Sequence, residues 1–155
     1  AGVLIKEAIF SAEIRLRRHH ITLINGMEMD CPDFKIQGSK KMLVASITNL
    51  IDNSIHWLET KAPKQKYLYI GTTEDIEEGP AIVVGDNGPG FGKDDPEDLI
   101  APFFTRRAGG MGLGLYIVSE IMRVSQGRIV FPNKGDVDLP DQIKGAVVAL
   151  QFLET

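Results

Sequence analysis

The chain has 155 residues, a length typical of one folded domain with its own hydrophobic core. Hydrophobic residues make up 43% and charged residues 25% of the sequence, a globular composition that excludes a disordered or fibrous class. The net charge of -4 excludes a broad basic surface for nucleic acid or acidic lipid, so any polyanion must be bound locally.

Cysteine usage and hydropathy indicate the compartment. The single cysteine, Cys31, cannot form an internal disulfide, and no Cys/His cluster has metal-site spacing, which fits a reducing cytoplasm. No apolar run reaches the roughly 20 residues that span a bilayer, and Glu7 and Glu13 stand where a secretion signal would be apolar. We expect residues 1–155 to form one domain without nucleic-acid or membrane contact. The Ala-Gly start, without an initiator Met, suggests that this domain is excised from a longer chain.

The first segment reads as a helix followed by two strands. Apolar residues at helical spacing predict a helix over Gly2–Arg18. Its basic end continues into His19 and His20, which could bind metal or be phosphorylated. Because no acidic neighbour follows in the sequence, we interpret the pair as a solvated helix end. Strands are predicted over Ile21–Gly26 and Asp33–Gln37.

The central segment, Ser39–Lys61, predicts a long amphipathic helix with Ser39 as its N-cap. Its polar face is unusual because two asparagines four residues apart each cost about half a kcal/mol relative to Ala. A carboxamide oxygen can ligate Mg²⁺, and the amide can donate to a phosphate. The face could therefore line a nucleotide site, or it could be a solvated face that holds two asparagines. Its members are Asn49, Asp52, Asn53 and His56.

Two strands, Tyr67–Thr72 and Ala81–Gly85, are predicted around an acidic loop at Glu74–Gly79. Asp86 follows the second strand and begins the sequence Asp-Asn-Gly-Pro-Gly. A carboxylate at a strand end can accept a hydrogen bond from an exocyclic amine, and glycines let the backbone approach a flat ring. On its own, the motif could equally be a tight turn.

A glycine-rich segment comes next, after a short helix predicted over Asp94–Ala101. Its glycines precede an apolar helix predicted over Tyr116–Ser125, where backbone N–H groups and the helix dipole would favour a phosphate. A dinucleotide fingerprint is excluded, because no strand immediately precedes these glycines. Thr105, Arg106 and Arg107 would form a lid over phosphates, with one of the two arginines exposed to solvent.

The chain ends with two predicted strands, Arg128–Phe131 and Ala146–Phe152. Between them, Pro132–Gly145 is a polar loop rich in Pro and Gly. We expect this loop either to contact a partner or to have no role.

Four motifs occur in a diagnostic order: Asn49-x-x-x-Asn53, Asp86-x-Gly88-x-Gly90, Phe103-Phe104 and Gly110-Met111-Gly112-Leu113-Gly114-Leu115. Together they resemble the nucleotide site of the GHKL (Bergerat-fold) ATPases, and most closely the catalytic ATP-binding domain of sensor histidine kinases. The resemblance extends from the first helix to the last strand. It implies an α+β fold, a two-layer α/β sandwich with a mixed, mostly antiparallel sheet and helices packed on one face.

The resemblance also implies a role for each motif. Asn53 would ligate the Mg²⁺ that bridges the ATP phosphates, with Asn49 beside it and His56 near a phosphate. Asp86 would accept a hydrogen bond from the adenine amino group, alongside a water, in a pocket shaped by Gly88 and Gly90. Asn49, Asn53 and Arg106 are the implied catalytic residues. The lid would be anchored by Phe103 and Phe104 and formed by Thr105, Arg106, Arg107 and residues to Gly109, and the triphosphate would be lined by Gly110, Met111, Gly112, Leu113 and Gly114.

Position 49 separates kinases from hydrolases within the resemblance. The gyrase, mismatch-repair and chaperone branches usually have a water-activating Glu there, whereas asparagine cannot take up a proton. The implied activity is transfer of the γ-phosphoryl group to a histidine on a dimerisation domain, in the same chain or a partner chain. A response regulator would act downstream, and the parent could be membrane-anchored. The alternatives are a nucleotide-sensing module and a hydrolytic ATPase.

Two departures from the family pattern matter here. His19, His20 and His56 all lack the Ser-His-Glu/Asp context of a phosphoacceptor, so the accepting histidine must lie elsewhere. Ser54 stands where the family commonly has Ala, a change from which we expect no consequence.

Overall fold

The computed structural model describes residues 1–60, 63–91, 96–101 and 114–153. Ten helices and strands follow one another in these ranges. In chain order they are α1 (Gly2–Arg18), β1 (Ile21–Asn25), the short 3₁₀ helix η1 (Gly26–Glu28), α2 (Lys40–Thr60), β2 (Lys66–Thr73), β3 (Ala81–Asp86), α3 (Pro96–Leu99), α4 (Gly114–Val124), β4 (Gly127–Val130) and β5 (Val147–Phe152).

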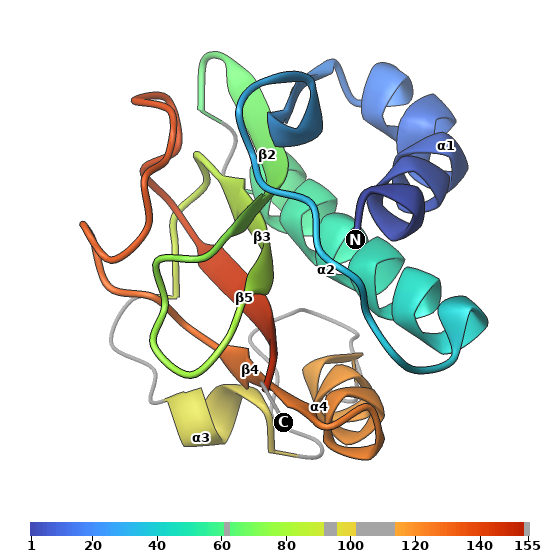
Figure 1. Cartoon of the computed structure of the whole chain (residues 1–155). Coiled ribbons are helices and arrows are strands. Elements are labelled where there is room, and N and C mark those ends of the chain that lie inside the picture. Colours follow the sequence, from blue (N-terminus) through green and yellow to red (C-terminus); the bar gives the residue numbers. More distant parts are fainter. Residues whose placement is uncertain (61–62, 92–95, 102–113, 154–155) are drawn as a thin grey trace.

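The described strands form one sheet in the order β1-β2-β3-β5-β4 (Figure 1). β1 pairs with β2 in parallel, and the other three pairings are antiparallel. The acidic loop joins β2 to β3 as an antiparallel pair, as predicted. The predicted fold class, with a mixed and mostly antiparallel sheet, is confirmed.

The three long helices, α1, α2 and α4, lie on one face of this sheet (Figure 1). α1 and α2 run side by side, and α4 packs against α2 at its other flank (Figure 1). Ile47, Ile51 and Leu58 of α2 are fully buried against sheet residues such as Leu68 and Leu150. Burying one such side chain contributes roughly 1.5–3 kcal/mol, so tertiary packing stabilises α2 more than helix propensity does. None of the described helices combines the length and apolar character needed to cross a membrane.

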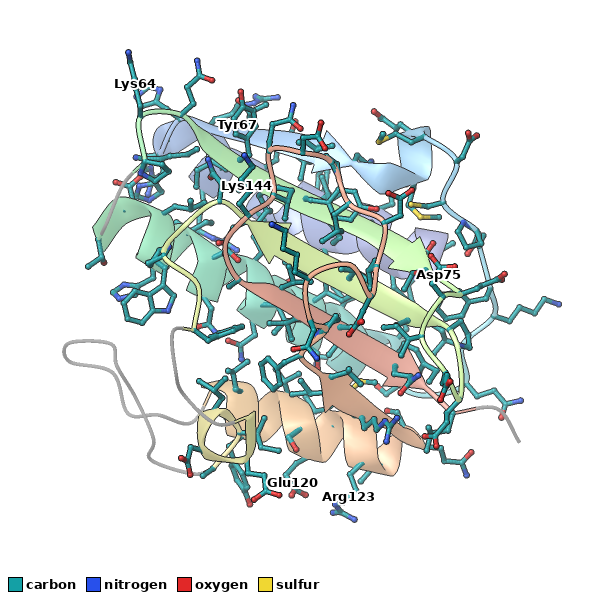
Figure 2. All side chains as sticks on the ribbon, turned by 90° about the vertical axis from the view of Figure 1, so that its left-hand side faces the viewer. Lys64, Tyr67, Asp75, Glu120, Arg123 and Lys144 are labelled. Atoms are coloured by element: carbon teal, nitrogen blue, oxygen red, sulfur yellow. The ribbon has the colours of Figure 1, made fainter. Side chains whose placement is uncertain are left out.

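The opposite face of the sheet is covered by the loop between β4 and β5. This segment, predicted as a polar loop, contributes Val137 and Ile143 to a second buried cluster with Tyr69, Val83 and Ala149. Figure 2 looks onto this face, and the loop that carries Lys144 crosses in front of the strands. The loop therefore has a structural role that the sequence interpretation did not assign.

The strand predicted over Asp33–Gln37 is wrong, because no strand is present there. The aromatic ring of Phe34 packs 6.0 Å from that of Phe152, and Ile36 also packs against the core. This segment bonds to the start of the chain instead of joining the sheet: the Phe34 carbonyl accepts from the Ala1 amino group at 2.6 Å, and the Asp33 carboxylate accepts from Gly2 N at 2.9 Å. The alternation of apolar residues therefore predicted correctly that Phe34 and Ile36 face the core, but not whether their backbone pairs with a strand.

Candidate nucleotide site

Asp86 lies at the end of β3, a strand whose six residues are all buried. Its side chain is 1% exposed. The carboxylate oxygen Oδ1 accepts hydrogen bonds from the N–H groups of Gly88 at 2.9 Å and Ala146 at 3.2 Å. Ser54, on the buried face of α2, lies close enough to the carboxylate to lower its pKa. The predicted adenine-binding carboxylate is thus held by backbone N–H groups of its own turn and of the segment that enters β5.

Burial raises the pKa of Asp86, and the nearby Ser54 side chain and the N–H groups of Gly88 and Ala146 oppose this effect only in part. All three groups are neutral. No cationic group is among the causes of the shifted pKa. The buried carboxylate can therefore accept a hydrogen bond from a neutral amine. Such a charge-assisted hydrogen bond is stronger than one between neutral groups.

The turn after Asp86 packs directly on the chain segment that enters β5. The backbone of Asp86 exchanges two hydrogen bonds with this segment, accepting from Gly145 N at 2.8 Å and donating to Ala146 O at 3.0 Å. A Cβ at position 145 would lie only 2.5 Å from the Gly88 oxygen and 2.7 Å from Asp86 Oδ1. Gly145 therefore permits an approach that no other residue allows. Sequence analysis missed Gly145 and Ala146, although a glycine immediately before the last strand was the available signal.

Asn87 shows that the Asp-Asn-Gly motif is more than a turn. Its side-chain oxygen accepts from the N–H group of Tyr67 at 2.8 Å, and its amide donates to the Gln65 carbonyl at 2.6 Å. These bonds tie the turn to the start of β2. The two readings of the motif, turn and binding element, are therefore compatible.

The polar face of α2 meets the start of α4. Ser39 caps α2, as predicted, by accepting from Met42 N at 3.3 Å. Further along α2, Asn49 donates from Nδ2 to the carbonyl of Gly114 at 3.4 Å. A Cβ on Gly114 would come within 3.2 Å of Asn49 Oδ1. Asn53 is half-buried one turn further along α2, and His56 follows with its ring 5.2 Å from that of Trp57.

The structure thus brings together Asn49 with Gly114 and Asp86 with Ser54, all against α2. Gly88 lies in the Asp86 turn, and Gly90 follows it with φ +77, a conformation that favours glycine. The other predicted site residues lie outside the described residues and remain predictions. They are Phe103, Phe104, Thr105, Arg106, Arg107, Gly110, Met111, Gly112 and Leu113.

Two polar residues have structural partners that the sequence did not suggest. Asp52, placed on the polar face of α2, accepts from Arg15 Nε of α1 at 2.9 Å and so joins the two helices. The interpretation of the His pair as a solvated helix end agrees with His20, which is exposed, but His19 also has a partner, because its Nδ1 lies 3.0 Å from a carboxylate oxygen of Glu59. Lys66 also donates to Glu59 at 2.8 Å, and this bond is the main reason that the pKa of Glu59 is lowered.

A sheet with helices on one face, a buried aspartate at a strand end and asparagines on the facing helix define the class of nucleotide-binding domains expected from the motifs. Comparison with known proteins agrees. Residues 38–153 match the family described as histidine kinase-, DNA gyrase B-, and HSP90-like ATPase. The chain belongs to this family.

Within this family, the chain is similar to sensor proteins and to the catalytic domains of histidine kinases. The chain is 31% identical over 153 residues to the C4-dicarboxylate transport sensor protein DctB of Pseudomonas aeruginosa, covering 96% of this chain and 23% of that protein. It superimposes on the catalytic domain of the histidine kinase ThkA with a TM-score of 0.73 at 21% identity, covering 99% of this chain and 91% of that one. It also matches ThkA crystallised with the response regulator TrrA, with a TM-score of 0.70 at 20% identity over 100% and 40% of the two chains. The predicted family and fold are therefore confirmed.

Proposed function

We propose that this domain binds Mg-ATP between α2, the Asp86 turn and the start of α4, and donates the γ-phosphoryl group to a histidine outside the described chain. The observation that carries the proposal is that one helix, α2, lies against both the Asp86 turn and the start of α4. Ser54 of α2 faces Asp86, and Asn49 of α2 faces Gly114. Family membership supports the choice of ATP.

The chemistry of the two ends orients the nucleotide. The Asp86 carboxylate offers an acceptor in a nearly water-free position, which suits the exocyclic amine of adenine. α4 begins at Gly114 beside Asn49, so its N-terminal N–H groups and helix dipole favour the phosphates. We therefore place the base against β3 and the triphosphate along the polar face of α2.

The residues of the site could bind Mg²⁺ only together with the phosphates of a bound nucleotide. Among the described residues, no group of three His, Cys, Asp or Glu side chains could hold a metal ion by itself. Mg²⁺ in nucleotide sites commonly takes one or two protein oxygens and completes its shell with phosphate oxygens and water. The Asn53 carboxamide, with Asn49 one turn away, would supply such an oxygen, and bound Mg²⁺ would neutralise phosphate charge during transfer.

Phosphoryl transfer is favoured over hydrolysis by the residue at position 49. Asn49 cannot accept a proton from water, so the site lacks the base that a hydrolase would need at this position. Relatives support this choice, since those described above include a sensor protein and a histidine kinase crystallised with a response regulator. We infer a response regulator downstream of this domain as well.

The accepting histidine would come from a dimerisation domain. The chain spans about a fifth to a quarter of the length of the first curated relatives, so the whole protein has room for such a domain. Within the described chain, His19 is paired with Glu59 on the outside of α2. We propose a cytoplasmic location for this domain, in a parent protein that can be membrane-anchored.

A nucleotide titration with and without Mg²⁺ tests the binding site. Asn53→Ala should abolish the Mg²⁺ dependence of ATP affinity, because the carboxamide ligand is removed. Asn133→Ala, at an exposed position in the β4–β5 loop, is the matched control and should leave the affinity unchanged. An Asn53→Ala protein with unaltered Mg²⁺-dependent affinity would overturn the metal assignment.

The transfer step needs its own measurement. Labelled ATP, incubated with this domain and a histidine-bearing helical domain of the same parent, should give an acid-labile phosphohistidine and little free phosphate. ATP binding without transfer to that domain would indicate a nucleotide-sensing module. Steady-state hydrolysis by the domain alone would instead indicate a hydrolytic ATPase.

A further inference from the structure

Helix α1 is apolar on two opposite faces. Its inner face carries the buried residues Leu4, Ile5, Ala8, Ala12 and Leu16. Its outer face carries Val3, Phe10 and Ile14, which are 63%, 79% and 69% exposed and are called the outer row below. At 100° per residue, the outer row spans about 40° of the helix surface and lies about 180° from the buried residues. A surface helix normally has one apolar face and one polar face, so packing within the domain does not explain the outer row.

The outer row is a continuous stripe. Phe10 and Ile14 are one turn apart and therefore neighbours on the helix surface, and Val3 precedes Phe10 by two turns. Phe10 is the most exposed of the large apolar side chains in the part of the chain that the structure describes. α1 lies at the edge of the helix layer, with α2 between it and α4, so no described element covers this stripe (Figure 1). Contiguous exposed apolar side chains are typical of protein-interaction sites.

The charged residues beside the outer row identify the partner. Lys6 and Glu13 lie on the same flank of α1, within about 20° of each other, and one turn before and one turn after Phe10. The charge of this flank therefore changes sign about Phe10. A second α1 running in the opposite direction would place a glutamate against Lys6 and a lysine against Glu13. We propose that this face binds a second copy of the chain through an antiparallel α1–α1 contact, with the two Phe10 rings at the twofold axis.

The other charges on α1 are compatible with this arrangement. Glu7 is at the same height as Glu13 of the second copy, but it lies on the opposite flank and pairs with Lys40 of its own chain at 2.7 Å. Arg17 would lie over Val3 of the second copy, where its long apolar stem can cover that side chain. Its guanidinium also pairs with Glu13 of its own chain at 2.6 Å. The contact therefore brings opposite charges together without placing like charges against each other.

A single pair of helices makes a small interface. Interfaces below the standard size are weak, so we expect a dimer that forms in the micromolar range or above. The contact is made by the side of α1 that faces away from α2. The inference therefore does not rest on the proposed function, and it can be tested without nucleotide.

Sedimentation equilibrium of the whole chain, from micromolar to millimolar concentration, measures the association. The parent protein should show an equilibrium between monomer and dimer. Phe10→Ala should abolish the detectable dimer, because it removes the two aromatic side chains at the centre of the contact. Val124→Ala, at a 61% exposed side chain on α4, is the matched control and should leave the equilibrium unchanged. Both side chains are exposed, so neither substitution removes a residue of the core.

Charge reversals test the direction of the two helices. Lys6→Glu alone should raise the dissociation constant of the dimer at least about 10-fold, since two attractive pairs become repulsive. Glu13→Lys alone should do the same. An equal mixture of the two variants should restore the dimer, because one chain then presents two acidic side chains to two basic side chains of the other. Circular dichroism checks that each variant keeps the helix content of the parent protein.

The inference can fail in four distinct ways. A parent protein that stays monomeric at millimolar concentration would overturn it, and so would a dimer that persists in Phe10→Ala. A dimer that Phe10→Ala abolishes and Lys6→Glu leaves unchanged would refute the antiparallel arrangement. A monomeric parent protein whose binding to a histidine-bearing helical domain is lost in Phe10→Ala would assign this face to that domain instead. None of these results decides whether the domain binds ATP, so failure here is distinguishable from failure of the proposed function.

Discussion

Asp86→Asn is the most informative single change, because it removes a charge and almost no volume. The asparagine oxygen can still accept from Gly88 N and Ala146 N, so the turn keeps its backbone bonds. What is lost is a charged acceptor for the adenine amine. Hydrogen bonds to charged groups contribute roughly 1.5–3 kcal/mol, so the dissociation constant of ATP should rise roughly 10- to 150-fold.

The same substitution should weaken ATP binding but stabilise the domain that has no nucleotide bound. Burial raises the pKa of Asp86 above its ordinary value of 3.8, so the folded state favours the protonated carboxyl. The stability that this contributes is fully present below the ordinary pKa and is lost as the pH rises through the raised pKa. At pH 7 the ionised carboxylate therefore opposes folding, and Asp86→Asn should increase the free energy of unfolding of the domain without nucleotide.

Urea denaturation at pH 7 and calorimetric ATP titration measure the two effects on one protein preparation. Asp141→Asn, at an exposed position in the β4–β5 loop, is the control and should change neither quantity. An Asp86→Asn domain that binds ATP as tightly as the parent protein would refute the assignment of the adenine acceptor. Reduced stability at pH 7 together with weaker binding would show that the carboxylate has a stabilising partner besides Gly88 and Ala146.

Two further changes test the packing around the site. Gly145→Ala should weaken ATP binding at least 10-fold and destabilise the fold by about 1–3 kcal/mol, because its Cβ would approach the Gly88 oxygen to 2.5 Å. Gly135→Ala is the control in calorimetry, since its Cβ meets nothing within 4 Å and only its φ of +94 is unfavourable, so its ATP affinity should be unchanged. Ile143→Ala should cost about 2–4 kcal/mol in urea denaturation, because Ile143 is buried on the second face of the sheet. Leu153→Ala, at a 42% exposed side chain, should cost well under half of that, and equal losses would contradict the described cover of this face.

The helices could be predicted because their signals are local. The apolar spacing of α1 and α2 follows a period of 3.6 residues, and the predicted helix over Gly2–Arg18 has the observed ends. Ser39 marked the start of α2 through a hydrogen bond to a residue only three positions away. In both cases, the information lies within one or two turns of chain.

The parts that could not be predicted depend on contacts between distant residues. Phe34 and Ile36 alternate as in a strand, but whether that backbone joins a sheet depends on which edges are free in the folded protein. Likewise, the acidic partner of His19 is Glu59, 40 positions later in the sequence, so a search of its sequence neighbours could not find it. The role of the β4–β5 loop was hidden because Val137 and Ile143 stand apart among polar residues, without any periodic pattern.

For the candidate site too, the sequence predicted the residues but not the contacts between distant ones. The order of motifs identified Asn49, Asp86 and Gly114, but it could not show that Asn49 touches Gly114. Nor could it show the approach of Gly145 to the Asp86 turn, since the two are separated by almost 60 residues. Motifs report which residue types a family uses, whereas the contacts that orient those residues have to be found in the structure.

The arrangement of α2 also has a consequence for how the site responds to change. Asn53 and Ser54 are adjacent in sequence, and the 100° rotation between them directs one toward the proposed phosphate end and the other toward Asp86. A shift of α2 as a rigid body would therefore disturb base and phosphate recognition together. The position of α2 is itself fixed by the core and by the pairing of Asp52 with Arg15 of α1. Because α1 packs mainly along α2, a force applied to α1 would reach both ends of the proposed nucleotide site through one helix.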